Sequence, residues 1–163
     1  MIAQRRLTIF SIMIVAISIH LGASISIAGV DEAFSALANR DYAKALNEFK
    51  ILADQGNAAA QYNLAVMNKN GKGVPQNYAE AAKWFRMAAD QGHVRAQYNM
   101  AMMYYKGQGV PQDYLLAHMW ANLAARQGYA EAQSIQDAAA KAMTPAQIAE
   151  AQRMANDWHP SRK

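Results

Sequence analysis

The side chains that most often carry out covalent or metal chemistry are sparse in this sequence. The 163 residues include no cysteine, which excludes thiolate nucleophiles, disulfides and cysteine-bound metals. Outside the N-terminal segment the histidines are His93, His118 and His159, and they fall in separate stretches. They lack the H-E-x-x-H spacing that places two metal ligands on one helix face. We therefore expect packing or surface roles for them and no metal site.

Nucleophiles and paired carboxylates have no distinctive pattern either. Four hydroxyl residues are candidate nucleophiles: Ser35, Ser134, Thr144 and Ser161. None lies in a strained turn beside a predicted base, which an activated hydroxyl needs. The twelve carboxylates are scattered, whereas glycoside hydrolysis needs a close pair. The sequence therefore predicts a protein that is not an enzyme and that uses no cofactor.

A different set of side chains has the composition of a protein-binding surface. Exposed tyrosine, methionine and arginine are enriched where proteins bind proteins. Such residues occur at helical spacing in two matching segments: Tyr62, Val66 and Lys69, then Arg95, Tyr98, Met102, Tyr105 and Lys106. Positions i, i+4 and i+7 share one helix face. These eight residues are the candidate binding surface; the alternative is that the tyrosines only pack between adjacent units.

The segments that carry these residues repeat with a fixed period. Residues 59–92 return as residues 95–128, at an offset of 36, with 18 of 34 aligned positions identical. A repeat of this length is one supersecondary unit that buries its apolar face only by stacking on its neighbours. The sequence therefore predicts a stacked array, which presents an extended surface rather than one enclosed pocket.

Each unit is predicted to begin with a helix that ends at a glycine loop. Ala60, Leu64 and Met67 fall at i, i+4 and i+7, the spacing of one buried helix face. The loops GKGVPQ (71–76) and GQGVPQ (107–112) follow these first helices. Glycine accepts positive φ and the residue before proline leaves the helical region, so both loops should end the helix.

A second helix should follow each loop, because in-phase residues can cap it. The predicted N-caps are Asp41, Asn77 and Asp113. The second helices are predicted over residues 42–54, 78–90 and 114–126.

Two atypical segments flank the full units. Residues 31–38 predict a short helix, and residues 131–143 begin like a further first helix but lack the glycine loop. Thr144 and Gln147 have capping-box spacing, with Pro145 at the first helical position, which predicts a helix over 145–157. Since stacked arrays need atypical ends to cover exposed apolar faces, we expect this helix to be a C-terminal cap.

The residues that recur at the same positions in both full units resemble the Sel1-like repeat, a relative of the tetratricopeptide repeat. The resemblance covers residues 41 to about 134 and rests on G-x-G-V-x-Q-D-Y-x-x-A-x-x-W, closing on A-A-x-Q-G. Asn68 departs from the pattern where the family favours tyrosine. The resemblance implies an all-α, right-handed superhelical solenoid of antiparallel helix pairs. It also implies an adaptor or scaffold that binds proteins through its concave helix face, where the eight candidate residues would lie.

The first 28 residues have the three parts of a secretory signal. Arg5 and Arg6 form a positive start, residues 7–21 are apolar, and Ser26 and Ala28 place small residues at the −3 and −1 positions of a cleavage site. We expect cleavage after Ala28. The alternative is an inner-membrane anchor formed by residues 7–30, a stretch without charged residues that is long enough to span a bilayer.

Cleavage would leave a solenoid over residues 29–143 and a capping helix with its tail over 144–163, in the periplasm or secreted. The loss of two arginines would leave 14 basic and 12 acidic residues, without a basic run that indicates nucleic-acid binding. Membrane contact is expected only through the N-terminal segment if it stays uncleaved.

The sequence thus predicts a non-enzymatic interaction module of the bacterial cell envelope that binds a protein or peptide partner. The alternative is a cell-wall glycan-binding or glycan-hydrolase function in the periplasm, because Tyr98, Tyr104 and Tyr105 could stack on sugars.

Overall fold

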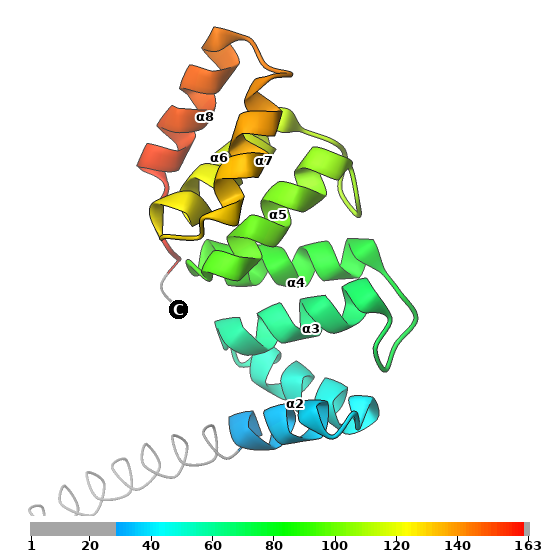
Figure 1. Cartoon of the computed structure of the whole chain (residues 1–163). Helices are drawn as coiled ribbons and strands as arrows, with labels where there is room; N and C mark the ends of the chain where they lie inside the picture. The colour runs from blue at the N-terminus through cyan, green and yellow to red at the C-terminus, as the bar shows by residue number, and fades with distance from the viewer. Residues whose placement is uncertain (1–28, 162–163) are drawn as a thin grey trace, which may run out of the picture. The chain divides into compact units, whose positions relative to one another are not determined.

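The computed structural model describes residues 29–161, and every regular element in that range is an α-helix (Figure 1). The predicted signal peptide, residues 1–28, lies outside the described residues. The chain divides into two compact units, with the boundary after Glu48. The described part of the first unit runs over residues 29–48 and that of the second over residues 49–161.

In the first unit, residues 29–38 are helical, which confirms the short helix predicted over 31–38. Helix α2 (Tyr42–Asp54) begins here and continues into the second unit. Asp41 is its N-cap as predicted, since Oδ1 accepts a hydrogen bond from the Lys44 backbone N–H at 3.1 Å. An exposed ion pair of 2.6 Å joins Lys44 to Glu32, and pairs of this kind contribute little to stability.

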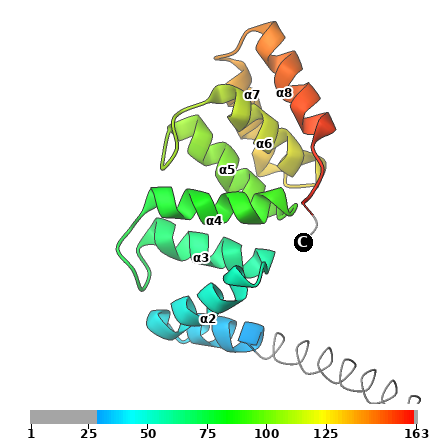
Figure 2. The same ribbon diagram turned by 180° about the vertical axis from the view of Figure 1, so that it is seen from behind.

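The second unit holds the end of α2 and six further helices. These are α3 (Ala58–Asn70), α4 (Tyr78–Asp90), α5 (Val94–Lys106), α6 (Tyr114–Arg126), α7 (Glu131–Ala140) and α8 (Pro145–Asp157). Helix α3 packs on α4 and α5 packs on α6, so consecutive helices form pairs (Figures 1 and 2). The second helices and the C-terminal helix have the predicted bounds. The sequence was sufficient here because a recognisable capping residue directly precedes each of these helices.

The apolar faces predicted for the first helices form the core of this unit. The three predicted core residues of α3, Ala60, Leu64 and Met67, are buried, and so are their equivalents in α5, Ala96, Met100 and Met103. From the second helices, Phe85 and Trp120 are fully buried. Alanines of α4 and α6 lie in register beside them and allow close helix packing. Each pair therefore buries large side chains of both helices against small ones.

The glycine loop of the second repeat packs directly on the start of α4. Gly109 has φ 72°, as its predicted turn role requires. A Cβ at this position would lie 2.2 Å from the Tyr78 carbonyl oxygen and 2.9 Å from the Ala79 nitrogen. Backbone cannot yield as a flexible side chain does, so only glycine allows the loop to approach this closely. The loop therefore fixes how one repeat lies on the preceding one.

The C-terminal helix and the tail that follows it run back toward the end of α4. Thr144 and Gln147 form the predicted capping box at the start of α8, which packs on α6. Trp158 then meets Trp120 edge to face at 6.4 Å. Ser161 ends the described chain with a backbone N–H donated to the Asp90 carbonyl oxygen at 2.7 Å. The tail therefore contacts the end of α4 in the first full repeat.

Two glycine substitutions separate backbone strain from steric contact. Gly128 also has positive φ, 88°, but a Cβ there would meet nothing within 4 Å. We expect Gly128→Ala to lower the free energy of unfolding by about 1–2 kcal/mol, the cost of a left-handed backbone. Gly109→Ala should cost about 1–3 kcal/mol more, because α4 must also shift. Urea denaturation of both variants measures the difference, and equal losses would contradict the tight loop contact.

Candidate functional site

A buried glutamine relay sets how the first helices follow one another. The Gln97 side chain has no exposed surface, and its Nε2 donates to the Ala89 carbonyl oxygen at 3.3 Å. Its Oε1 accepts a hydrogen bond from Gln127 Nε2 at 2.7 Å. The same relay occurs one unit earlier, through Gln91, Gln61 and Ala53. Each first helix is thereby linked to the end of the preceding second helix and to the end of the next.

Two tyrosines of the candidate surface form equivalent ring contacts, 36 residues apart. The Tyr62 ring stacks on His93 at 4.6 Å, and the Tyr98 ring lies 4.9 Å from Tyr129. Tyr62 also packs on buried Phe85 at 5.7 Å. Both tyrosines are half-buried. They therefore pack between adjacent units, as the alternative interpretation held, and still present part of each ring.

Burial raises the pKa of both tyrosines above its ordinary value, and their neutral hydroxyls can donate hydrogen bonds. For Tyr62, Arg95 acts in the opposite direction through its charge and a hydrogen bond. The structure thus brings Arg95 next to Tyr62, across from α5 to α3.

Toward the other end of α3, a lysine of the candidate surface forms a hydrogen bond to α5. Lys69 is half-buried and donates to Asn99 Oδ1 at 3.0 Å, a link from α3 to α5. Burial, and then the charge of nearby Lys106, lower the pKa of Lys69. Both lysines lie in the last turn of their helices.

The remaining candidates differ in their contacts and in their exposure. The Tyr105 ring contacts the Tyr114 ring of α6 edge to face at 5.6 Å. The Tyr105 side chain therefore points toward α6, the second helix of the same pair. Val66 and Met102 are half-buried, whereas Arg95 and Lys106 are exposed. We call the eight predicted residues on α3 and α5 the first-helix face. Its role in binding stays a prediction.

Sequence reasoning missed two groups that this face depends on. His93 is the N-cap of α5, since its Nδ1 accepts the Ala96 backbone N–H at 3.2 Å. The in-phase residue of the preceding unit, Asn57, caps α3 in the same way, which is the signal that could have revealed it. Asn99 is the second group, and its partner Lys69 lies 30 residues away, so local spacing gives no sign of the contact.

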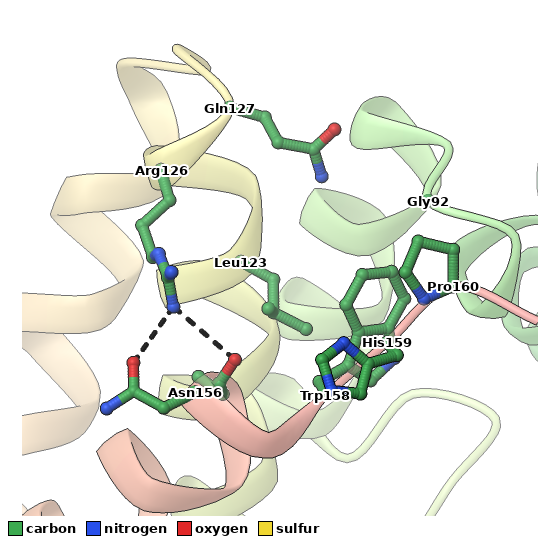
Figure 3. A pocket seen from close by; sticks show the side chains of 9 residues that line it. Gly92, Leu123, Arg126, Gln127, Asn156, Trp158, His159 and Pro160 are labelled. Atoms are coloured by element: carbon green, nitrogen blue, oxygen red, sulfur yellow. Dashed lines mark hydrogen bonds between the residues drawn. The ribbon is translucent and has the colours of Figure 1, made fainter.

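A pocket of about 380 Å³ opens on another part of the second unit, beneath the tail (Figure 3). Its lining comes from the turn after α4, from α6 and from the end of α8 with the tail. The residues are Gly92, Leu123, Arg126, Gln127, Ala155, Asn156, Trp158, His159 and Pro160. Arg126 donates to Asn156 Oδ1 at 3.0 Å and to the Ala155 carbonyl oxygen at 3.4 Å. Its guanidinium is therefore committed to the C-terminal end of α8.

Other kinds of site are not evident in residues 29–161. Over that range no three or more His, Cys, Asp or Glu side chains gather in a way that could hold a metal ion. Helices with the length and apolar character needed to cross a membrane are also absent from it. His118 is buried on α6, in the packing role expected for it.

Comparison with known proteins identifies the repeat. The Sel1 repeat family matches residues 58–93 and 94–129, the two full units described above. No curated protein matches this sequence. The chain therefore carries two Sel1 repeats, as the sequence pattern predicted, and such repeats generally mediate protein–protein interaction.

Two solved structures share the arrangement of helices. One is a protective antigen present in uropathogenic Escherichia coli strains, which displays an SLR fold, at 28% identity and a TM-score of 0.76. The other is a Sel1 repeat protein from Oxalobacter formigenes, at 24% identity and a TM-score of 0.63. Each match covers 82% of this chain but only 29% and 56% of the other chain, respectively. The chain therefore has the α-helical solenoid fold of Sel1 repeat proteins and spans part of their length.

The His93 cap predicts a pH dependence of stability. Burial lowers the pKa of His93, and the cap needs an unprotonated Nδ1. The unfolded chain therefore binds this proton more readily, so stability present above about pH 6.5 is lost as the pH falls through the folded pKa. We expect this loss, measured by urea denaturation at several pH values, to approach about 1 kcal/mol, a typical value for an N-cap.

His93→Asn is the matched control, because asparagine caps α3 at the equivalent position and does not titrate. Any contribution of His118, whose pKa burial also lowers, is common to both proteins and cancels in the comparison. The variant should lose less stability on acidification than the wild-type protein. Equal losses would rule out the cap as the acid-sensitive group.

Proposed function

We propose that this protein is a non-enzymatic interaction module of the bacterial cell envelope, which binds a protein partner on its first-helix face. The observation that carries the proposal is a row of half-buried rings on α3 and α5 beside cations that have no carboxylate partner within residues 29–161. Tyrosine, methionine and arginine side chains such as those of this face are enriched where proteins bind proteins. The general role of Sel1 repeats supports the same conclusion.

The location in the envelope rests on the N-terminal sequence, with its positive start, apolar stretch and small residues before Gly29. In this proposal the partner is a protein or peptide that is also exposed in the envelope.

A second candidate function is the binding of a cell-wall glycan. Tyr98, Tyr104 and Tyr105 are half-buried residues of α5, and sugars can stack on exposed parts of aromatic rings. Protease treatment of an envelope extract separates the two candidates. Capture by the immobilised protein is lost if the partner is a protein and is kept if it is a glycan.

The double variant Tyr98→Ala and Tyr105→Ala tests the proposed surface. We expect partner binding, measured by calorimetry with the protein captured from envelope extract, to weaken by at least about 2 kcal/mol. Thermal unfolding should change much less than after Leu64→Ala, a core truncation expected to cost about 2–5 kcal/mol. A collapsed thermal transition with unchanged affinity per folded molecule would instead place the tyrosines in the core.

The location has its own test. When the full sequence is expressed in a Gram-negative host, we expect the protein in the periplasmic fraction with Gly29 as its first residue, as the small residues at −3 and −1 predict. N-terminal sequencing of the purified protein gives the answer directly. Recovery from the inner membrane with the first 28 residues still attached would support the anchor formed by residues 7–30.

A further inference from the structure

The Lys69 ammonium is held in place but not neutralised. An ammonium group has three N–H donors, and Asn99 Oδ1 is the acceptor for one of them. Lys69 forms no ion pair with any of residues 29–161. A half-buried charge is costly unless it is paired. Two donors of this group are therefore free to bind a further acceptor.

Asn99 is oriented by its own helix and not by the lysine. Its side chain is buried, and its Nδ2 donates to the Arg95 carbonyl oxygen at 2.8 Å. With the amide nitrogen committed to this carbonyl, the amide oxygen must face Lys69. The amide therefore fixes the position of the ammonium before any partner arrives, which lowers the entropy cost of binding.

A second lysine lies at the end of the neighbouring first helix. Lys106 is on the last turn of α5, and after burial its charge also lowers the pKa of Lys69. The helix dipole favours a cation at each helix C-terminus and so accounts for Lys106 as a surface residue. It does not account for Lys69, whose ammonium reaches away from the end of α3 to Asn99 of α5. Lys69 is therefore a cation held at the contact of α3 with α5 without an anionic partner in residues 29–161.

The cluster is not part of the repeat. One unit later, the positions of Lys69 and Asn99 are occupied by Tyr105 and Ile135. Asn63, which is in phase with Asn99, makes the same bond to its own helix, Nδ2 to the Ala59 carbonyl oxygen at 2.8 Å. The asparagine–backbone bond therefore recurs with the fold, whereas the lysine at the α3–α5 junction is not needed for stacking.

We propose that Lys69, held in place by Asn99, forms a seat for a carboxylate, the side chain of an Asp or Glu in an extended segment of the protein partner. Charge-assisted hydrogen bonds from an ammonium to a carboxylate are about twice as strong as neutral ones. Apolar residues beside the acidic one would contact Tyr98 and Met102, half-buried on the same helix. This inference rests on the proposed function and adds the chemistry of the partner.

The test uses pairs of synthetic peptides of about twelve residues, long enough for an extended recognition segment. Each is acetylated and amidated at its ends. In one set Asp and Glu alternate with Phe, Tyr and Leu, and in the matched set Asn and Gln replace the acids. Fluorescence anisotropy with the protein of residues 29–163 should give acidic peptides an affinity at least about tenfold higher.

Lys69→Met should remove this preference and leave the affinity for the amide peptides unchanged. Lys83→Met is the matched control, because Lys83 is an exposed lysine of α4 paired with Glu80 and the variant loses the same charge. The control should keep the preference. Lys69→Arg, which restores a cation, should recover part of it, and circular dichroism checks that each variant is folded.

The outcomes that overturn the inference are distinct. Equal affinity of wild-type protein for acidic and amide peptides removes the carboxylate seat but leaves the proposed function intact. The same holds if Lys83→Met abolishes the preference as fully as Lys69→Met, because net charge alone then explains it. One further amide peptide is left without C-terminal amidation, so that its only carboxylate is the C-terminus. If it binds more tightly than the acidic peptides, the assignment to a side chain is wrong. No binding of either set up to about 1 mM, a very weak affinity, would count against both proposals.

Discussion

The stacking of the repeats depends on two glutamine side chains buried without exposed surface, Gln61 and Gln97. A buried amide that loses a partner costs about 1–3 kcal/mol, so each helix end must lie within hydrogen-bonding distance of its glutamine. Gln97 satisfies this requirement on both sides, through Ala89 behind it and Gln127 ahead. Apolar packing alone would tolerate small slips between units. The glutamine hydrogen bonds prevent such slips and fix the register of one unit on the next. The contacts between α3 and α5 on the first-helix face depend on this register.

The fold could be predicted because each unit has the same phase. Residues such as Asn77 and Asp113 are capping types placed directly before a helical pattern, and both accept the bond expected of them. Because the units repeat every 36 residues, each helix and turn predicted in one unit is predicted again in the next. A wrong prediction in one unit would therefore disagree with its equivalent in the other. Local sequence carries this information because caps and glycine turns act over three or four residues.

The site was predicted less completely, because its contacts join residues that are far apart in the chain. The helical spacing placed Lys69 on the correct helix, but the bond to Asn99 depends on the packing of α3 against its neighbours. His93 was missed for another reason: histidine is not among the favoured N-cap residues, and here a ring nitrogen replaces the usual side-chain oxygen. The sequence thus predicts which helix face carries the candidate residues and which residue types it contains. The hydrogen-bond partners of these residues on other helices are seen only in the structure.

The bond from Ser161 to Asp90 has a consequence for how the second unit unfolds. In an array where each repeat contacts only its neighbours, the ends fray first and the middle can stay ordered. Here the tail spans back over 71 residues to the end of α4. Opening the C-terminal end therefore also releases a contact of the first full repeat. The two repeats should exchange their amide protons together, as one cooperative block, instead of in a gradient from the end of the chain.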